Sequence, residues 1–285
     1  MKKRIIARLD IKGPNLVKGI HLEGLRVLGS PKDFASYYSD NGADELCYMD
    51  VVASLYNRSS LFDLVRETAE LVSIPLAVGG GLRNIDDIKK MLRSGADKVI
   101  LNTAAVRNPE LITEAALKFG SSTIAIAIES IRDETGNYFA FTDNGREESG
   151  MEVQKWAQTA EKLGAGEIVL TSVDREGTGR GVDEKLIQMV SRVVNIPVIA
   201  HGGVGTEDDC KIAFYSGADA LAIASLFHYN SIDKVTIVPI SKGEGNREFL
   251  NNRSNLTRFK ETSIIKIKDF LEQNGIPMRT VSRHL

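Results

Sequence analysis

The chain has 285 residues, 42% of them hydrophobic and 26% charged, and its 36 basic residues nearly balance its 38 acidic ones. The resulting net charge of −2 offers no electrostatic footprint for nucleic acid or an anionic membrane. A short apolar run near the N-terminus ends at Asp10, which predicts a strand rather than a signal sequence, and no stretch approaches the roughly 20 apolar residues that span a bilayer. Two cysteines make a disulfide framework implausible and favour a reducing cytoplasm.

Strand and helix patterns alternate along the whole chain. Mostly apolar runs, typical of parallel strands covered on both faces, occur at 4–11, 45–51, 75–78, 98–101, 123–129, 167–172, 197–200 and 220–223. Helical patterns follow at 31–41, 60–72, 85–94, 109–119, 150–163, 184–194, 206–215 and about 263–273. Eight such units in about 250 residues predict a single α/β domain over residues 1–285, a (β/α)8 TIM barrel.

The segment 75–103 recurs at 197–225 without a gap, with ten of 29 positions identical. Each copy reads as a strand, a glycine turn, a helix, the tetrapeptide Ser-Gly-Ala-Asp and a second strand. Self-similarity of this length indicates an internal duplication. The sequence therefore predicts a barrel built from two duplicated half-barrels.

The glycine turns of the repeat each lie between a strand and the start of a helix. Bare backbone N–H groups and the helix dipole attract anions there, and glycine allows close approach. The alternative is that these glycines only make tight turns. Two cradles on opposite sides of the barrel mouth would suit a ligand with a phosphate at each end. The candidate phosphate-binding residues are Gly80, Gly81, Asn102 and Thr103 in the first copy and Gly202, Gly203, Ala224 and Ser225 in the second.

Carboxylates occur at equivalent ends of the first and fifth predicted strands. Asp10 and Glu129 could divide acid and base roles if their environments separate their pKa values, although both could merely cap strand ends. Lys18 follows Asp10 and could offer a positive charge to a ligand. Further candidates for the substrate loops after strands two and six are Asp50, Thr171, Asp174 and Gly177.

Charged residues also occur at the other end of the barrel, where four predicted strands begin. Arg4, Glu45, Lys98 and Glu167 could form an ion-paired layer that closes the bottom. Spacing alone favours a structural plug, because the bottom face of such barrels usually serves stability.

Taken together, the segments KRIIARLD, LVKG, GADELCYMD, AVGGGLRN, GADKVILNTAAVRNPELI, GAGEIVLTSVDREGT and ASLFHY resemble, in the same order, those of the cyclase subunit of imidazole glycerol phosphate synthase. The likeness covers nearly the whole chain except an insertion at 234–262. It implies an enzyme of histidine biosynthesis, a carbon–nitrogen lyase without a cofactor or metal. Its ammonia would come through the barrel from a glutaminase subunit docked at the N-terminal face. Its substrate would be a bisphosphorylated ribulosyl-aminoimidazole-carboxamide nucleotide.

The resemblance also assigns roles to individual residues. Asp10 matches a catalytic aspartate, Lys18 a loop lysine and the glycine cradles the phosphate sites. The four charged residues at the strand starts match an ammonia gate, which reverses the plug interpretation.

Departures from the family pattern gather on the catalytic side. Glu129 stands where the family has its second catalytic aspartate, Arg8 and His201 replace small residues, and the insertion at 234–262 enlarges that face. An added methylene displaces a carboxylate by about 1 Å, which can cost on the order of 10²-fold in rate. The alternatives are therefore a paralogue that delivers ammonia to a sugar-modifying amidotransferase and, third, a single-substrate isomerase on the same plan.

Overall fold

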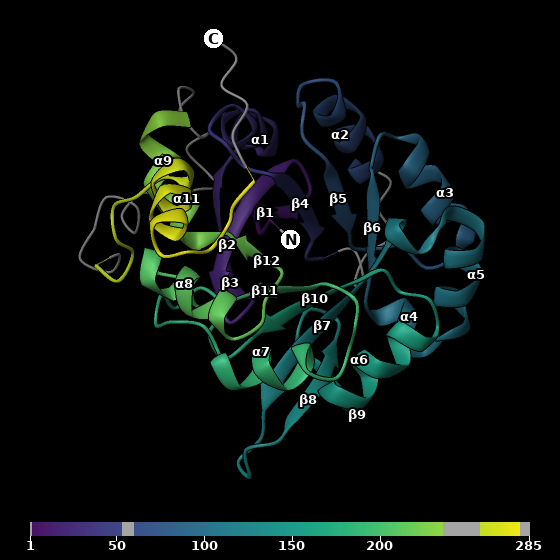
Figure 1. Ribbon diagram of the computed structural model, residues 1–285. Helices are drawn as coiled ribbons and strands as arrows, with labels where there is room; N and C mark the ends of the chain where they lie inside the picture. The colour runs from purple at the N-terminus through teal and green to yellow at the C-terminus, as the bar shows by residue number, and fades with distance from the viewer. Residues whose placement is uncertain (1, 53–59, 236–256, 280–285) are drawn as a thin grey trace.

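The computed structural model describes residues 2–52, 60–235 and 257–279. Its centre is a closed barrel of eight parallel strands with helices around the outside (Figure 1), which confirms the predicted TIM barrel. Pairing of β7 with β10 and of β12 with β1 closes the ring. Around the ring the strands are β1 (Arg4–Lys12), β4 (Glu45–Asp50), β5 (Leu76–Gly79), β6 (Lys98–Leu101), β7 (Ile124–Arg132), β10 (Glu167–Ser172), β11 (Val198–His201) and β12 (Ala220–Ile223).

The eight expected helices are present with slightly shorter bounds. They are α1 (Pro31–Asp40), α2 (Ser60–Ala69), α3 (Ile85–Arg93), α5 (Glu110–Phe119), α6 (Val153–Lys162), α7 (Glu184–Ser191), α8 (Glu207–Tyr215) and α11 (Ile264–Gln273). Helices α4 (Thr103–Arg107) and α9 (Ser225–Val235) and the 3-10 turn η1 (Ser121–Thr123) were not predicted. Both unpredicted α-helices begin within two residues of a strand end, too close for a separate apolar pattern to show.

Two antiparallel hairpins correct the expected strand ends. Strands β1 and β7 run past Asp10 and Glu129 and pair with β2 (Asn15–Ile20) and β8 (Tyr138–Thr142). The hairpins are completed by β3 (Glu23–Gly29) and β9 (Glu147–Glu152). The expectation that helix 150–163 begins at Gly150 was wrong, because residues 150–152 belong to β9. Neither carboxylate is therefore a strand-end cap.

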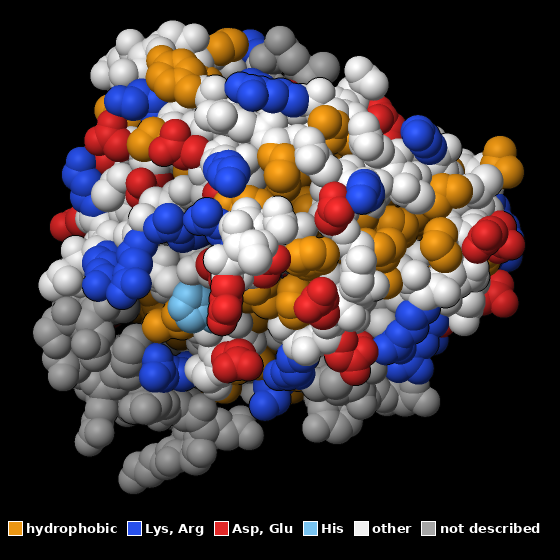
Figure 2. Space-filling model, turned by 90° about the horizontal axis from the view of Figure 1, so that it is seen from below, with side chains coloured by type: hydrophobic (Ala, Val, Ile, Leu, Met, Phe, Trp, Pro, Cys, Tyr) orange, Lys and Arg blue, Asp and Glu red, His pale blue; other side chains and the backbone are white. Residues whose placement is uncertain are grey.

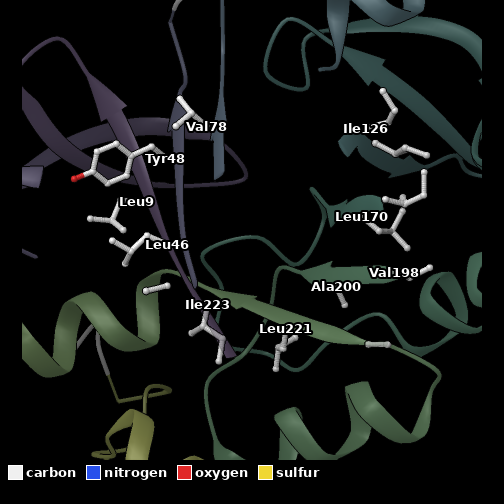
Figure 3. Close-up of a cluster of buried hydrophobic side chains, with 14 of the residues drawn as sticks. Leu9, Leu46, Tyr48, Val78, Ile126, Leu170, Val198, Ala200, Leu221 and Ile223 are labelled. Carbon is white, nitrogen blue, oxygen red and sulfur yellow. The ribbon is translucent and has the colours of Figure 1, made fainter. Parts of the chain in front are cut away.

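The core has two layers, set by the alternation of side chains along each strand. Residues such as Leu9, Leu46, Leu170 and Leu221 point outward and pack under the helices (Figure 3). The alternate residues point into the barrel and form a separate, smaller cluster in which Ala77, Ala125, Ala127, Ala220 and Ala222 are small. These small residues leave room in the lumen for larger side chains.

The repeat has the same physical basis in both copies. The carboxylate of Asp97 accepts a hydrogen bond from the backbone N–H of Leu76 at 2.8 Å, and that of Asp219 accepts one from Val198 at 3.1 Å. The side chains of Asn84 and Thr206 cap α3 and α8. Equivalent positions in the two copies thus tie each strand to its neighbour and start each helix, which keeps the two glycine turns in equivalent places.

Part of the expected insertion lies outside the described residues, namely 236–256. Lys234 and Val235 belong to the end of α9. The described end of the insertion lies against the start of α8, where Lys260 donates its backbone N–H to Gly205 and its Nζ to Glu207 at 2.8 Å. This end of the insertion therefore adjoins the second glycine turn.

One face of the molecule agrees with the balanced composition. Figure 2 shows acidic and basic side chains interspersed with hydrophobic ones, without a large field of one sign. No helix in the described ranges is long and apolar enough to cross a membrane.

Candidate active site

The first glycine turn opens into the larger of the cavities at the barrel mouth, with a volume of about 300 Å³. Gly80 has a φ of +101°, and a Cβ at this position would lie 2.5 Å from the carbonyl oxygen of Asp50. Only glycine fits such a turn without a backbone shift. The cavity brings together the predicted residues Asp50, Gly80, Gly81, Asn102, Thr103 and Glu129, and also Arg107 and Asn144, which were not predicted.

The second glycine turn repeats the first turn closely but encloses far less space. Gly202 has a φ of +105°, and its Cβ would lie 2.6 Å from the carbonyl oxygen of Ser172. The cavity there is about 10 Å³, and His201 and Phe259 contribute to its walls. The predicted residues in this lining are Gly177, Gly202, Gly203, Ala224 and Ser225.

Unpartnered polar atoms surround the second turn. The hydroxyl oxygens of Ser172 and Ser225 and Nε2 of His201 are buried without a hydrogen-bond partner. Nδ1 of His201 lies 2.9 Å from the carbonyl oxygen of Ala222, which can only accept, so Nδ1 carries the proton. Burial lowers the pKa of His201, so the ring is neutral and Nε2 is an unused acceptor. Buried polar atoms without partners are rare and often mark a place where a ligand or water binds.

Asp10 lies at the centre of a buried ionic network. Its carboxylate accepts from Arg8 Nε at 2.9 Å and from Lys18 Nζ at 3.0 Å. Lys18 reaches in from β2 and also contacts the carboxylate of Glu176. Burial alone would raise the pKa of Asp10, but Arg8 and Lys18 hold it well below its usual range. Asp10 is therefore ionised throughout the neutral range.

Glu129 stands on β7, four strands from β1 in either direction around the barrel, so it lies across the mouth from Asp10. Its Oε2 accepts a hydrogen bond of 2.8 Å from the backbone N–H of Gly145. Burial raises the pKa of Glu129 to about 7, against the opposing pull of Arg8. The two carboxylates thus have clearly separated pKa values, as an acid and base pair requires.

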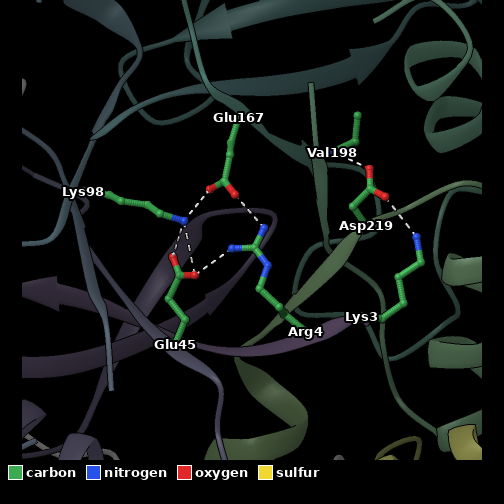
Figure 4. Close-up of polar contacts among 7 residues, drawn as sticks. All are labelled: Lys3, Arg4, Glu45, Lys98, Glu167, Val198 and Asp219. Carbon is green, nitrogen blue, oxygen red and sulfur yellow. Dashed lines mark hydrogen bonds and ion pairs between the residues drawn. The ribbon is translucent and has the colours of Figure 1, made fainter. Parts of the chain in front are cut away.

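The four charged residues at the strand starts form a continuous ion-paired ring (Figure 4). Arg4 contacts Glu45 at 2.8 Å and Glu167 at 2.6 Å. Lys98 contacts Glu167 at 2.8 Å and Glu45 at 3.4 Å. Burial would lower the pKa of Arg4, but the two glutamates raise it. The ring closes the N-terminal end of the lumen with alternating charges.

Two loop residues behave differently from the prediction for the run after β10. Asp174 is exposed and lines neither cavity at the mouth; its carboxylate accepts the backbone N–H of Arg132 at 3.0 Å. Glu176, which was not among the predicted site residues, is completely buried and holds both Lys18 and the backbone N–H of Leu22. The neighbouring Thr171 accepts from Arg8 at 3.3 Å. The polar run after β10 thus positions the β2–β3 hairpin.

Over residues 2–52, 60–235 and 257–279 there is no group of three or more His, Cys, Asp or Glu residues that could hold a metal ion.

The fold and the mouth place the chain among (β/α)8 barrels with duplicated halves. Residues 4–233 match a family described as "Histidine biosynthesis protein", and the chain belongs to this family. It is 57% identical over 202 residues to the imidazole glycerol phosphate synthase subunit HisF of Legionella pneumophila, covering 71% of this chain and 95% of that protein. It is 46% identical over 231 residues to the HisF of Alkaliphilus metalliredigens (strain QYMF), covering 81% and 92%. The resemblance seen in the sequence is thereby confirmed.

Proposed function

We propose that the chain is the cyclase subunit of an imidazole glycerol phosphate synthase. It would use ammonia to convert the bisphosphorylated ribulosyl-aminoimidazole-carboxamide nucleotide to imidazole glycerol phosphate and aminoimidazole-carboxamide ribotide. The observation that carries the proposal is the pairing of Asp10 and Glu129, with separated pKa values, on opposite strands between two glycine cradles. Membership of the histidine biosynthesis family supports it.

Each carboxylate suits a different step. Asp10 remains ionised between two cations and would stabilise positive charge on nitrogen as ammonia adds to the substrate carbonyl. Glu129, with a pKa of about 7, can both donate and accept a proton at neutral pH and would act as the general acid and base of ring closure. Lys18 would contact the substrate from the hairpin. Gly80 and Gly202 would help bind the two phosphates.

The supply of ammonia accounts for the ring at the bottom of the barrel. A glutaminase subunit docked on the N-terminal face would release ammonia next to Arg4, Glu45, Lys98 and Glu167. An ion-paired ring opens only if a pair separates, so it can act as a gate. We place the protein in the cytoplasm, because its two described cysteines are both free and buried, as suits a reducing compartment.

Turnover tests this function directly. Purified protein receives an ammonium salt and the bisphosphorylated nucleotide, and both products are measured by chromatography. We expect the wild-type chain to form both. If it forms neither while Glu129→Asp does, the longer carboxylate has abolished the family reaction in this chain.

A second candidate function has one specific observation in its favour. Arg8 occupies one oxygen of Asp10 and Lys18 the other, which leaves this carboxylate fewer free lone pairs for a substrate. The paralogous role keeps the ammonia conduit but passes ammonia to a sugar-modifying amidotransferase. A chain that stimulates its glutaminase yet turns over no nucleotide would support it. A chain that neither binds nor stimulates any glutaminase of its genome would exclude the ammonia conduit that both functions share.

A further inference from the structure

Arg8 lies inside the barrel, between the ion-paired ring and the mouth. Side chains on β1 that point into the lumen are Arg4, Ile6, Arg8 and Asp10, because alternate residues of a strand face the same side. Arg4 belongs to the ring and Asp10 to the mouth. Arg8 is 2% exposed, so protein encloses its guanidinium in the part of the lumen that lies between the ring and Asp10.

The Arg8 side chain crosses the lumen. It starts on β1, and its Nη1 lies 3.3 Å from the hydroxyl of Thr171 on β10. Strands β11 and β12 stand between β1 and β10 in the ring, so this contact spans the interior of the barrel. Its Nε is held by Asp10 at the same time, which fixes both ends of the guanidinium.

A small chamber lies below Arg8. Its volume is about 10 Å³, close to the space that one water-sized molecule requires. Cys47, which is opposite Arg8 in the β1–β4 register, contributes its wall, and the floor includes three members of the ring.

We infer that Arg8 is a second, inner barrier that separates this chamber from the mouth, so that passage along the lumen requires the Arg8 side chain to move. The charges of Arg8 and Lys18 balance those of Asp10 and Glu176, so an ammonium ion would leave water there without gaining a free partner, at a cost that neutral ammonia does not bear. The barrier therefore selects neutral ammonia. Because Asp10 binds both Arg8 and Lys18, the same carboxylate connects the barrier to the hairpin at the mouth.

Cys47 provides a probe of this barrier in the chain by itself. The variants are Arg8→Ala, which removes the bridging side chain, and Arg8→Met, which keeps its bulk without its charge. Each is treated with the small neutral reagent methyl methanethiosulfonate, and modification of Cys47 is followed by mass spectrometry. Cys210, which is completely buried in α8 outside the lumen, is the internal control for general loosening.

Opening of the chamber and loss of the Arg8 charge should change the rate of Cys47 modification in opposite directions. Burial raises the pKa of Cys47 to about 12 and the charge of Arg8 opposes this, so loss of the charge alone would slow modification. If Arg8 closes the chamber, Arg8→Ala should accelerate Cys47 modification by about tenfold or more, since access then dominates thiol reactivity. Arg8→Met should be no faster than the wild type, and Cys210 should not change in any variant.

The inference is overturned if Arg8→Ala leaves the Cys47 rate unchanged or lower, if Arg8→Met is as fast as Arg8→Ala, or if Cys210 accelerates in parallel. Arg8→Ser, whose hydroxyl can still meet Asp10, replaces Arg8→Ala if that variant does not fold. The selection of ammonia rests on the proposed function, whereas the barrier itself does not. Failure of the wild type to form product would therefore overturn the proposed function and leave the Cys47 result standing.

Discussion

The two glycine cradles share a backbone but differ in the space they enclose. Gly80 and Gly202 have φ values of +101° and +105°, and each turn passes close to the last carbonyl oxygen of the neighbouring strand, that of Asp50 on β4 or Ser172 on β10. The first cradle opens into about 300 Å³, the second into about 10 Å³. The duplication has therefore preserved the turn, while side chains around it set the room available to a ligand.

The side chains that fill the second cradle come from two parts of the chain. His201 occupies the position that is Gly79 in the first copy, and Phe259 comes from the end of the insertion and contacts Tyr229, with ring centroids 5.1 Å apart. A phosphate can enter the first cradle as it stands. Binding at the second requires these side chains to shift, so the two ends of a substrate should bind with different kinetics.

Substitution of Asp10 or Glu129 should change turnover most, and the two substitutions should change stability differently. Glu129→Gln should lower ammonia-dependent turnover on the order of 10²–10⁴-fold, the usual contribution of general acid–base catalysis. Asp10→Asn should lower it on the order of 10²–10³-fold, as expected for loss of one electrostatic stabiliser. Asp10→Asn should also lower the free energy of unfolding by about 3–5 kcal/mol, because Arg8 and Lys18 lose their buried partner. Glu129→Gln, which loses no ion pair and removes a buried carboxyl that is partly ionised at pH 7, should instead raise the free energy of unfolding in urea at pH 7, by up to about 3 kcal/mol. Equal destabilisation by both variants would contradict the assigned environments.

Next in size is the pH dependence of stability. The pKa of Glu129 is raised from its ordinary 4.5 to about 7 in the folded chain. The folded state therefore binds more protons than the unfolded state between these values, and stability falls as pH rises through them. The contribution of Glu129 should be fully present below about pH 4.5, with roughly 3 kcal/mol lost by pH 8. Unfolding of wild type and Glu129→Gln across this range measures it, and parallel curves would refute the assignment.

The shared turn can be tested by a matched pair of substitutions. Gly80→Ala and Gly202→Ala each place a Cβ within 2.6 Å of a backbone oxygen at positive φ. Both should cost about 2 kcal/mol or more in unfolding free energy, since alanine is strained in this region. Gly24→Ala, whose Cβ meets nothing within 4 Å, controls for φ alone. A large difference between the two cradle variants would show that the turns are not equivalent.

The smallest effect concerns how the described end of the insertion, residues 257–262, is held beside the second cradle. The pair between Lys260 and Glu207 is largely exposed on the lysine side, so Lys260→Ala should change the unfolding free energy by less than about 1 kcal/mol. Phe259→Ala should cost more, because it removes ring contacts with Tyr229. The reverse order in thermal unfolding would mean that the charge pair holds the segment.

Much of the fold could be predicted because the repeat and the apolar strands carry local signals. The hairpins could not, since β2 and β3 are held in part by contacts distant in sequence, such as those of Glu176 with Lys18 and Leu22. The ring residues were found because each begins a strand. Arg8 was noticed as a departure, but its reach to Thr171 depends on barrel closure and on the small residues that leave it room.

In the proposed function, the mouth holds one substrate by two phosphates, one in each cradle. Calorimetry with the bisphosphorylated nucleotide and with its two monophosphorylated forms measures this directly. Loss of either phosphate should weaken binding by roughly one to two orders of magnitude, as expected for removal of charged hydrogen bonds worth about 1.5–3 kcal/mol. If removal of the phosphate at one end leaves the affinity unchanged, only one cradle binds phosphate and the claim is wrong.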